Sequence, residues 1–472
     1  MNKLLILLAL SFWQMPVSAQ HDTLRQLSLT EFYGMVRNHH PIAKQAKLIL
    51  ERGEVVVSQA RGAFDPKLVS EYQTKQFQGK DYYDVWDSYV KVPTVLNVDL
   101  KAGYERNSGQ FLNPEHTVPS DGLYYAGVSV PLGQGLIHNS RNINLKKGMA
   151  EQQNLTSQAN AVYNNLLLDA NYVYWNWFET YQKMKVAEES LDLISERYDG
   201  IRESVINGDK AAIDSVESLI QVQTWRNELN KSRLNYQNAA LQMENFVWDS
   251  TRIFASHPDT VWQKQEVLVV DEYVNFAISN HPDLNAMQAD LLTLELDRKL
   301  AAENIKPVLN LNYNFLMASG NSSDESMAGL SNNYKGGFEF SFPLLIRKER
   351  AKLKQAKIKL EEGGLKLTSK SRMVTNKVFQ SYGKIIVLLE MLEEQRRIVE
   401  NYQRLLEGER TKFQNGESSV FLVNSRENKK IAAEMKLVNL EAEYGRAIGM
   451  VNWSSGYFAS QLENMQAQRG SQ

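Results

Sequence analysis

The stretch PVLNLNYNF at residues 307–315 decides the fold, because its side chains alternate strictly between two kinds. An apolar set, Leu309, Leu311, Tyr313 and Phe315, alternates with an amide set, Asn310, Asn312 and Asn314. Successive side chains of a β-strand point to opposite faces of its sheet, so this strand has one apolar and one polar face. A half-buried strand of a water-soluble sheet has the same alternation, so the rest of the chain must decide what lies on each side.

Composition excludes several classes of protein. The chain has 472 residues, a formal net charge of -2 and no cysteine. A balanced charge gives no electrostatic basis for nucleic-acid binding, which normally requires a basic domain or stripe. The absence of cysteine excludes disulfides, thiolate metal ligands and cysteine nucleophiles.

The N-terminus, MNKLLILLALSFWQMPVSAQ, has the form of a secretory signal peptide. Lys3 gives the positive start, residues 4–13 form a short apolar run, and residues 17–19 fit a cleavage site. We therefore predict a signal peptide at residues 1–19 and an exported protein. No later run of 18 or more apolar residues is present, so no membrane-spanning helix is predicted.

The chain is a tandem duplication. Pro41 and Pro66 are 25 residues apart, as are Pro282 and Pro307, and an Asn-His motif precedes the first proline of each pair. A second correspondence, at an offset of 208 residues, pairs RESVINGDK at 202–210 with RTKFQNGES at 410–418. Each half is predicted to contain lead-in helices, a strand region and a long helical hairpin.

The two strand regions differ in length. Pro66 and Pro131 are 65 residues apart, whereas Pro307 and Pro343 are 36 apart, so the first copy carries an insertion. Further alternating patterns are NVDLKAGY at 97–104, YYAGVSVPL at 124–132, GGFEFSFPL at 336–344 and, more weakly, residues 67–75. We predict two strands per half and four per chain. The insertion at 80–93 is interpreted either as a loop or as an extension of a strand.

The helical tracts have the pattern of coiled coils. No proline occurs in residues 345–414, where a seam steps by threes and fours: Ile385, Leu389, Leu392, Val399, Tyr402 and Leu406. Core helices of a large globular domain are the alternative. Gly208 and Gly416 are predicted to end the hairpins, since glycine supplies the backbone freedom that a reversal needs. The pair Gly363-Gly364 is predicted to mark a bend.

Four strands cannot close a barrel, which needs at least eight to leave no unpaired edge in lipid. A membrane barrel would therefore need several chains, and three would give twelve strands. The amide face would then line a water-filled lumen and the apolar face would contact lipid. The alternative is an exported periplasmic coiled-coil scaffold or adhesin without channel activity, whose strands form a soluble sandwich.

The order of these features resembles the TolC-like outer-membrane efflux protein family. The resemblance rests on the signal peptide, the two copies, the Asn-His-Pro lead-ins, Phe64-Asp65-Pro66, VSVPLGQGL at 128–136, FSFPLL at 340–345 and the Asn-Gly tips. It implies a mainly α protein with a β membrane part, in which long coiled-coil hairpins join a 12-stranded β-barrel shared by a homotrimer. It also implies the outer membrane of a Gram-negative bacterium, with a large periplasmic part.

The resemblance implies a passive exit duct of a tripartite efflux pump or a type I secretion system, not an enzyme. Expected partners are a periplasmic adaptor, an inner-membrane pump and outer-membrane lipid, with no nucleic acid. No cofactor is expected, since the chain has no phosphate-binding loop, nucleophile elbow or zinc motif. The basic run at 347–357 is either a solvated helix face or a positive collar that favours anionic cargo.

These expectations divide the chain into eight segments: signal peptide 1–19, helices 20–65, first strand region 66–131, first hairpin 132–250, connector and helices 251–306, second strand region 307–343, second hairpin 344–453 and tail 454–472.

Three sets of functional residues are predicted. The resemblance implies adaptor contacts at the tips: Asn207, Gly208, Asp209, Asp214, Asn415, Gly416 and Glu417. The alternation places Asn97, Asp99, Lys101, Asn310, Asn312, Asn314, Glu339 and Ser341 toward the lumen. It places Leu309, Leu311, Tyr313, Phe315, Phe338, Phe340 and Phe342 toward lipid. Leu422 and Ser425 replace acidic residues that form a selectivity ring in well-known members, so that ring is predicted to be absent.

Overall fold

The computed structural model describes residues 25–248, 256–259, 269–318 and 333–460. The predicted signal peptide at 1–19 lies outside these residues. The chain divides into two compact units. We call them the tip unit (Met1–Val36, Val173–Lys264 and Leu392–Ala442) and the sheet unit (Arg37–Tyr172, Gln265–Met391 and Glu443–Gln472).

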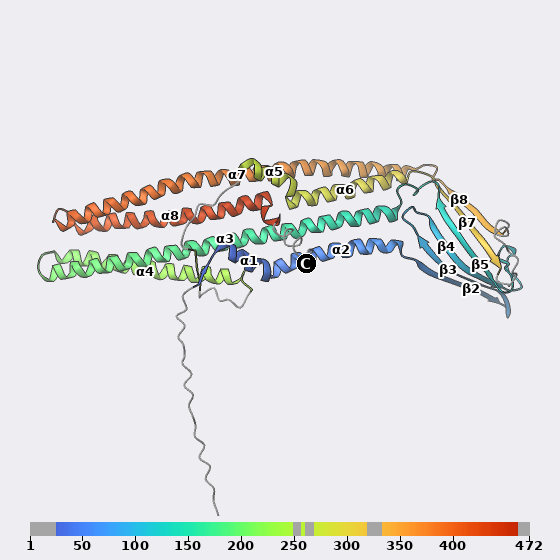
Figure 1. Ribbon diagram of the computed structural model, residues 1–472, viewed down its shortest axis with the longest axis horizontal. Coiled ribbons are helices and arrows are strands. Elements are labelled where there is room, and N and C mark those ends of the chain that lie inside the picture. Colours follow the sequence, from blue (N-terminus) through green and yellow to red (C-terminus); the bar gives the residue numbers. More distant parts are fainter. Residues whose placement is uncertain (1–24, 249–255, 260–268, 319–332, 461–472) are drawn as a thin grey trace, which may run out of the picture. The chain divides into compact units, whose positions relative to one another are not determined.

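Figure 1 labels the helices and the six strands of the larger sheet. The sheet unit contains α2 (Pro41–Arg61), β2 (Lys67–Phe77), β3 (Lys80–Pro93), β4 (Asp99–Ser108), β5 (Leu123–Pro131), α5 (Val270–Asn280), α6 (Pro282–Glu303), β7 (Val308–Ala318) and β8 (Tyr334–Ser341). The tip unit contains β1 (Arg25–Leu27), α4 (Ala212–Glu244) and β6 (Ser256–Pro258). Four helices contribute residues to both units: α1 (Leu29–His39), α3 (Ser140–Ile206), α7 (Arg347–Gln414) and α8 (Val420–Ser455).

The repeated His-Pro motif is a helix start. His40 precedes α2, and its Nδ1 accepts a hydrogen bond from the backbone N–H of Ile42 at 3.1 Å. His281 precedes α6 and accepts from the backbone N–H of Asp283 at 3.2 Å. Proline follows each histidine, at a position where its fixed φ suits a helix and its missing N–H has no helical partner. The motif therefore caps equivalent helices in the two repeats.

The sheet is antiparallel throughout, and its described strands number six, in the order β2-β3-β4-β5-β7-β8. The prediction of four strands per chain is wrong: the five alternating segments form β2, β4, β5, β7 and β8, and the segment at 80–93 forms β3. The sequence of β3 does not alternate: Trp86 and Val90 lie on one face of the sheet, while Val85 and Tyr89 lie on the other. Apolar residues on both faces remove the alternation by which a strand is recognised.

β3 and β4 form a hairpin that the second copy does not have in this sheet, and we call it the extra hairpin. The strand region of the first copy is 29 residues longer than that of the second copy. β3, β4 and their turn occupy residues 80–108, which also number 29, so the extra hairpin accounts for the difference. The remainder of the predicted fold, a mainly helical chain with long hairpins and an antiparallel sheet, is confirmed.

Four of the strands join helices directly. β2 follows α2, β5 precedes α3, β7 follows α6, and β8 precedes α7. We call the edge of the sheet that carries these junctions the helix end, and the opposite edge the loop end. The hairpin β3–β4 has no helix of its own. Both of its connections to the rest of the sheet, to β2 and to β5, lie at the loop end.

Small residues allow helices of the sheet unit to approach closely. On α2, Gly53 lies beside Gln152 of α3, and on α3, Gly148 lies beside Ala60 of α2. A Cβ added to Gly363 of α7 would stand 2.9 Å from the side chain of Leu291 on α6. α7 continues as a helix through Gly363-Gly364, so Gly363 permits close packing against α6 within an unbroken helix.

The tip unit has a conventional buried core. Tyr174, Trp175, Trp177, Phe178 and Tyr181 of α3 are buried, and Trp177 has none of its surface exposed. Phe32 of α1 stacks on Tyr174 with the ring centroids 6.0 Å apart. Toward the tips, the core continues with Ile194, Val222 and Ile431 from three different helices. These aromatic residues therefore serve packing.

Candidate functional site

One face of the sheet carries a row of apolar residues that crosses all six strands, and we call it the apolar face. The register aligns a row of six residues, one from each strand in spatial order: Leu68, Val90, Ala102, Ala126, Phe315 and Tyr334. This apolar face is solvent-exposed in the single chain, with Leu68 at 79% and Phe338 at 76% exposure. Burial of such surface is the main favourable term in folding and association, so the sheet presents an uncovered hydrophobic wall.

The opposite face is polar, and we call it the polar face. The neighbouring row of the same register reads Lys67, Lys91, Lys101, Gly127, Asn314 and Lys335. Closer to the helix end, the amide of Asn310 donates to the Glu339 carboxylate at 3.3 Å. The sheet therefore has one apolar side and one charged side.

The predicted strand residues fall on these faces, with two exceptions. Asp99, Lys101, Asn310, Asn312, Asn314, Glu339 and Ser341 share the polar face, and Leu309, Leu311, Tyr313, Phe315, Phe338 and Phe340 share the apolar face. Asn97 lies in the turn between β3 and β4, with a left-handed φ of 63°. Phe342 follows the last residue of β8.

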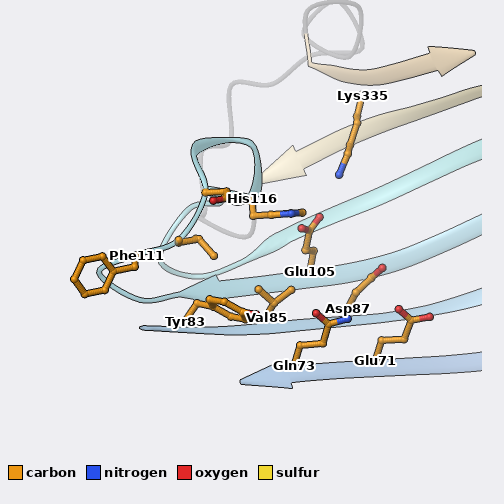
Figure 2. A pocket seen from close by; sticks show the side chains of 11 residues that line it. Glu71, Gln73, Tyr83, Val85, Asp87, Glu105, Phe111, His116 and Lys335 are labelled. Atoms are coloured by element: carbon orange, nitrogen blue, oxygen red, sulfur yellow. The ribbon is translucent and has the colours of Figure 1, made fainter. Parts of the chain in front are cut away.

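Three carboxylates lie side by side on the polar face, near the middle of the strands. Glu71 on β2 is directly opposite Asp87 on β3, which is directly opposite Glu105 on β4. They line a cavity of about 340 Å³ together with Lys335 of β8 and residues of the segment after β4 (Figure 2). The Tyr125 hydroxyl of β5 donates to Asp87 at 2.8 Å. The polar face therefore carries both acidic and basic groups.

The turn between β3 and β4 is fixed to the start of α3. One guanidinium nitrogen of Arg141 donates to Asn97 Oδ1 at 2.8 Å and to Asp99 Oδ1 at 2.7 Å. Lys91 Nζ lies 2.9 Å from the other carboxylate oxygen of Asp99. The Asn97 amide in turn donates to the carbonyl of Gly135 at 3.2 Å. Predicted as a lumen residue, Asn97 instead anchors the turn at the helix end.

The two hairpin tips have the same backbone structure. In the first, Asn207, Gly208 and Asp209 donate backbone hydrogen bonds to Glu203, Val205 and Ser204. In the second, Asn415, Gly416 and Glu417 donate to Thr411, Phe413 and Lys412, each 208 residues later. Both glycines have a left-handed φ, 82° for Gly208 and 78° for Gly416, which disfavours any residue with a side chain. The repeat is preserved at the level of individual hydrogen bonds.

The predicted tip residues are brought together. The Lys210 ammonium lies 3.9 Å from the ring centroid of Phe413, so the tip of one hairpin contacts the tip of the other. Asp214 lies in the first turn of α4, where a carboxylate interacts favourably with the helix dipole. Leu422, predicted in place of an acidic residue, is exposed on α8.

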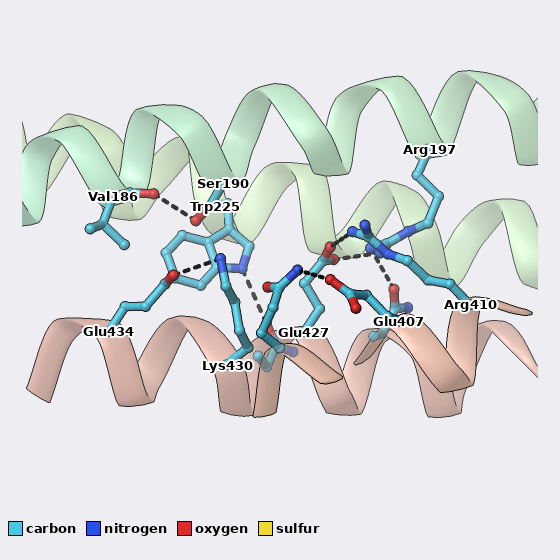
Figure 3. A network of polar contacts seen from close by, with 12 residues as sticks. Val186, Ser190, Arg197, Trp225, Glu407, Arg410, Glu427, Lys430 and Glu434 are labelled. Carbon is cyan, nitrogen blue, oxygen red and sulfur yellow. Dashed lines mark hydrogen bonds and ion pairs between the residues drawn. The ribbon is translucent and has the colours of Figure 1, made fainter. Parts of the chain in front are cut away.

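A buried ionic network joins the hairpins above their tips (Figure 3). The carboxylate of Glu427 on α8, whose residue is only 4% exposed, lies 2.5 Å from Arg197 on α3 and 2.9 Å from Arg410 on α7. Arg197 also donates to Asn424 at 2.8 Å, and Asn424 donates to Glu217 on α4 at 3.2 Å. All four helices of the two hairpins therefore share one network.

Sequence reasoning missed this network, although the repeat held a signal for it. At the offset of 208 residues, Glu427 corresponds to Leu219 and Arg197 corresponds to Leu405. A charged residue at a position that is apolar in the other copy suggests a specific partner. That comparison identifies a pair of opposite charges, but not the fact that α3 and α8 bring them into contact.

We also searched the described part of the chain for metal sites and membrane-spanning helices. Among those residues, no group of three or more His, Cys, Asp or Glu side chains is placed to hold a metal ion. None of the described helices combines the length and apolar character required to cross a membrane.

Comparisons with known proteins agree with this geometry. Residues 274–448, from within α5 to within α8, match the model of a family described as outer membrane efflux protein. A comparison with curated proteins finds no match. The outer-membrane channel OprN is similar in structure, with 13% identity, coverage of 91% of this chain and 89% of that chain, and a TM-score of 0.66.

Two further structures are similar. The outer membrane channel CmeC of Campylobacter jejuni has 12% identity, coverage of 91% of this chain and 85% of that one, and a TM-score of 0.64. The outer membrane protein VceC of Vibrio cholerae has 12% identity, coverage of 91% and 96%, and a TM-score of 0.65. These likenesses establish the fold, and the predicted resemblance to outer-membrane efflux proteins is confirmed.

Proposed function

We propose that this protein is the passive outer-membrane duct of an export machine, assembled as a trimer. The observation that carries the proposal is the two-faced sheet, with an exposed apolar row across all six strands and a charged row behind it. In the assembly, the apolar face contacts lipid and the polar face lines a water-filled lumen. Cargo passes through without chemical change.

The edges of the sheet require further copies. Among the described residues, β2 and β8 each have only one neighbouring strand, so their outer backbone groups lack partners within the chain. Unpaired backbone groups are not tolerated in lipid, and six strands are fewer than the eight of the smallest barrels. Pairing between copies satisfies both edges, and the family resemblance sets the number of copies at three.

The hairpin tips are the part that engages the rest of the machine. The tip residues Asn207, Gly208 and Asp209, with Asn415, Gly416 and Glu417, present two equivalent turns to a periplasmic adaptor. The network around Glu427 ties the two hairpins together, so separating them requires breaking buried ion pairs. Docking of the adaptor and an inner-membrane pump, or of the equivalent parts of a type I secretion system, would supply the energy for that opening.

The test is to extract the full-length protein from the outer-membrane fraction in mild detergent and measure its native mass. We expect three chains, and discrete conductance steps after insertion into a planar bilayer. A monomer in the periplasmic extract without conductance would refute the duct and support the periplasmic scaffold or adhesin. A trimer without conductance would leave the assembly intact but refute the open passage.

A further inference from the structure

We propose that the three copies close a wall of eighteen strands, because the hairpin β3–β4 is part of the membrane-spanning barrel in each copy. The inference rests on the proposed function and goes beyond it, since the resemblance implies twelve strands. The partner surface is the pair of edges β2 and β8, and its occupant is a second copy of this chain.

The first argument is that the two faces run through the extra hairpin in phase with its neighbours over most of the strand length. The register shifts only at the loop end, between Lys75 and Gln76 of β2. On the apolar side, Val90 of β3 and Ala102 of β4 lie in register between Leu68 of β2 and Ala126 of β5. On the polar side, Lys91 and Lys101 occupy the corresponding places. A hairpin that projected from the barrel into water would have no reason to keep one continuous apolar face.

The second argument is length. A transmembrane β-strand needs about 9–11 residues at the usual tilt. β3 has 14 residues and β4 has 10, against 11 for β2 and 9 for β5, so the extra strands span the same distance as their neighbours. A hairpin confined to a surface loop would not need strands of this length.

The third argument is that the turn of the hairpin is fixed at the helix end. Arg141 of α3 holds both Asn97 and Asp99, and the amide of Asn139 donates to the carbonyl of Val95 at 3.4 Å. The hairpin therefore extends from the loop end of the sheet to the first turn of a helix. Its turn is attached to the same helix that β5 joins.

The fourth argument concerns the free edges. β2 begins at the helix end and β8 finishes there, so the two strands run in opposite directions. When β8 of one copy meets β2 of the next, the pair is antiparallel, as every other pair in the sheet is. Residues of β2 and β8 are almost entirely exposed, whereas β3, β4 and β5 contain buried positions and β7 contains half-buried ones.

Eighteen strands change the width of the duct in the membrane. Barrel diameter grows roughly linearly with strand number, so the wall would be about one and a half times as wide as one of twelve strands. The hairpin also adds Asp87, Tyr89, Lys101 and Glu105 to the lining of each copy. The number of helices that join the sheet stays at four per copy.

The natural absence of cysteine allows a direct test of where the hairpin lies. Val90→Cys and Leu100→Cys place a single nitroxide label on the apolar face of β3 and β4, and Lys101→Cys places one on the polar face. Phe340→Cys on β8 is the reference. We expect the nitroxide labels at Val90→Cys and Leu100→Cys to collide with oxygen dissolved in the lipid, as the label at Phe340→Cys does. The label at Lys101→Cys should instead collide with a water-soluble nickel chelate. Water accessibility at all three hairpin positions would overturn the proposal.

Electron cryomicroscopy of the trimer in lipid nanodiscs counts the strands independently. We expect eighteen in the intact protein, and twelve in a variant lacking residues 80–108, in which β2 connects to β5 at the loop end. The diameter should fall by about one third. Twelve strands in the intact trimer would overturn this inference and leave the proposed function standing, whereas a soluble monomer would overturn both. The intact protein decides the matter if the deletion variant does not assemble.

Discussion

Two tryptophans show how differently the two units use apolar residues. Trp177 of α3 is completely buried in the tip unit, whereas Trp86 of β3 is 41% exposed on the apolar face of the sheet. The helices enclose their apolar side chains, as a protein in water must, while the sheet directs them outward. The difference teaches that an apolar residue holds a packed core together in the tip unit and forms part of an outward face on the sheet. The same substitution should therefore cost much more stability in the first place than in the second.

The largest expected effect comes from removing these tryptophans. Trp177→Ala should destabilise the tip unit by about 3–5 kcal/mol, because a large cavity opens in a packed core. Trp86→Ala should change stability by only about 0.5 kcal/mol, since its side chain lies on an exposed face. Urea unfolding followed by circular dichroism compares the two variants with the parent protein. Equal losses of stability would contradict the division between an enclosed core and an outward-facing sheet.

The ionic network is the next feature to test. Glu427→Ala leaves Arg197 and Arg410 without their shared carboxylate, and breaking a buried pair in this way destabilises by about 3 kcal/mol or more. We therefore expect looser hairpins, with faster amide exchange near the tips and a larger single-channel conductance. The matched control is Glu393→Ala, whose ion pair with Arg397 is exposed, and which should change neither quantity. Unchanged conductance in Glu427→Ala would separate the network from gating.

Charge on the two faces of one strand sharpens the comparison within the sheet. Phe338→Arg places a guanidinium on the apolar face at the middle of β8 and should destabilise the membrane-inserted trimer by about 2–4 kcal/mol. Gly337→Arg, one residue earlier, points to the polar face, where an added side chain has open space, and should be tolerated. The measurement is the fraction of trimer that resists dissociation in detergent on gels. Equal tolerance at both positions would mean that the apolar face does not meet lipid.

The smallest effect is a pH dependence at the cap of α6. Burial lowers the pKa of His281 below its ordinary value of 6.5, reinforced by Lys370 and opposed by Asp283. The neutral ring accepts from the N–H of Asp283, so its contribution is complete above pH 6.5 and is lost as the pH falls toward the lowered pKa. We expect a loss of about 1 kcal/mol, the usual contribution of an N-cap.

His281→Asn provides the control for this prediction. Asparagine accepts the same backbone hydrogen bond without titrating in this range, so the variant should keep its stability between pH 7 and pH 5.5. Thermal unfolding at both pH values measures the difference. A parent protein whose midpoint does not change over this interval, relative to the variant, would show that the cap does not depend on protonation.

Much of the fold could be predicted from the sequence because the strongest signals are periodic. The alternation at 307–315, the seam in α7 and the repeated tips each follow from the geometry of one element, and the structure has those elements. Of the extra hairpin, β4 has the alternating pattern at 97–104, but β3 was not predicted, because it has apolar residues on both faces. Strand pairing is a long-range property, and no local pattern reveals which neighbour a strand will have.

The candidate site was predictable to the same extent. Odd- and even-numbered residues of a strand lie on opposite faces, so the residues of the apolar face and of the polar face could be assigned from the sequence. Asn97 was misplaced because a single left-handed residue ended the alternation just before β4. The network of Arg197, Arg410 and Glu427 joins three helices, so its contacts depend on packing that no single segment encodes.

The placement of the extra hairpin implies that strands can be added to such a sheet in evolution only in even numbers. β2 delivers the chain to the loop end, and β5 must depart from it to reach α3 at the helix end. An inserted piece therefore has to return to the edge from which it started, which a pair of strands does and a single strand cannot. Circumference can thus vary in steps of whole hairpins while the helix junctions stay in place. The dimensions of the wall and the machinery of the tips are separable, and selection can act on one without disturbing the other.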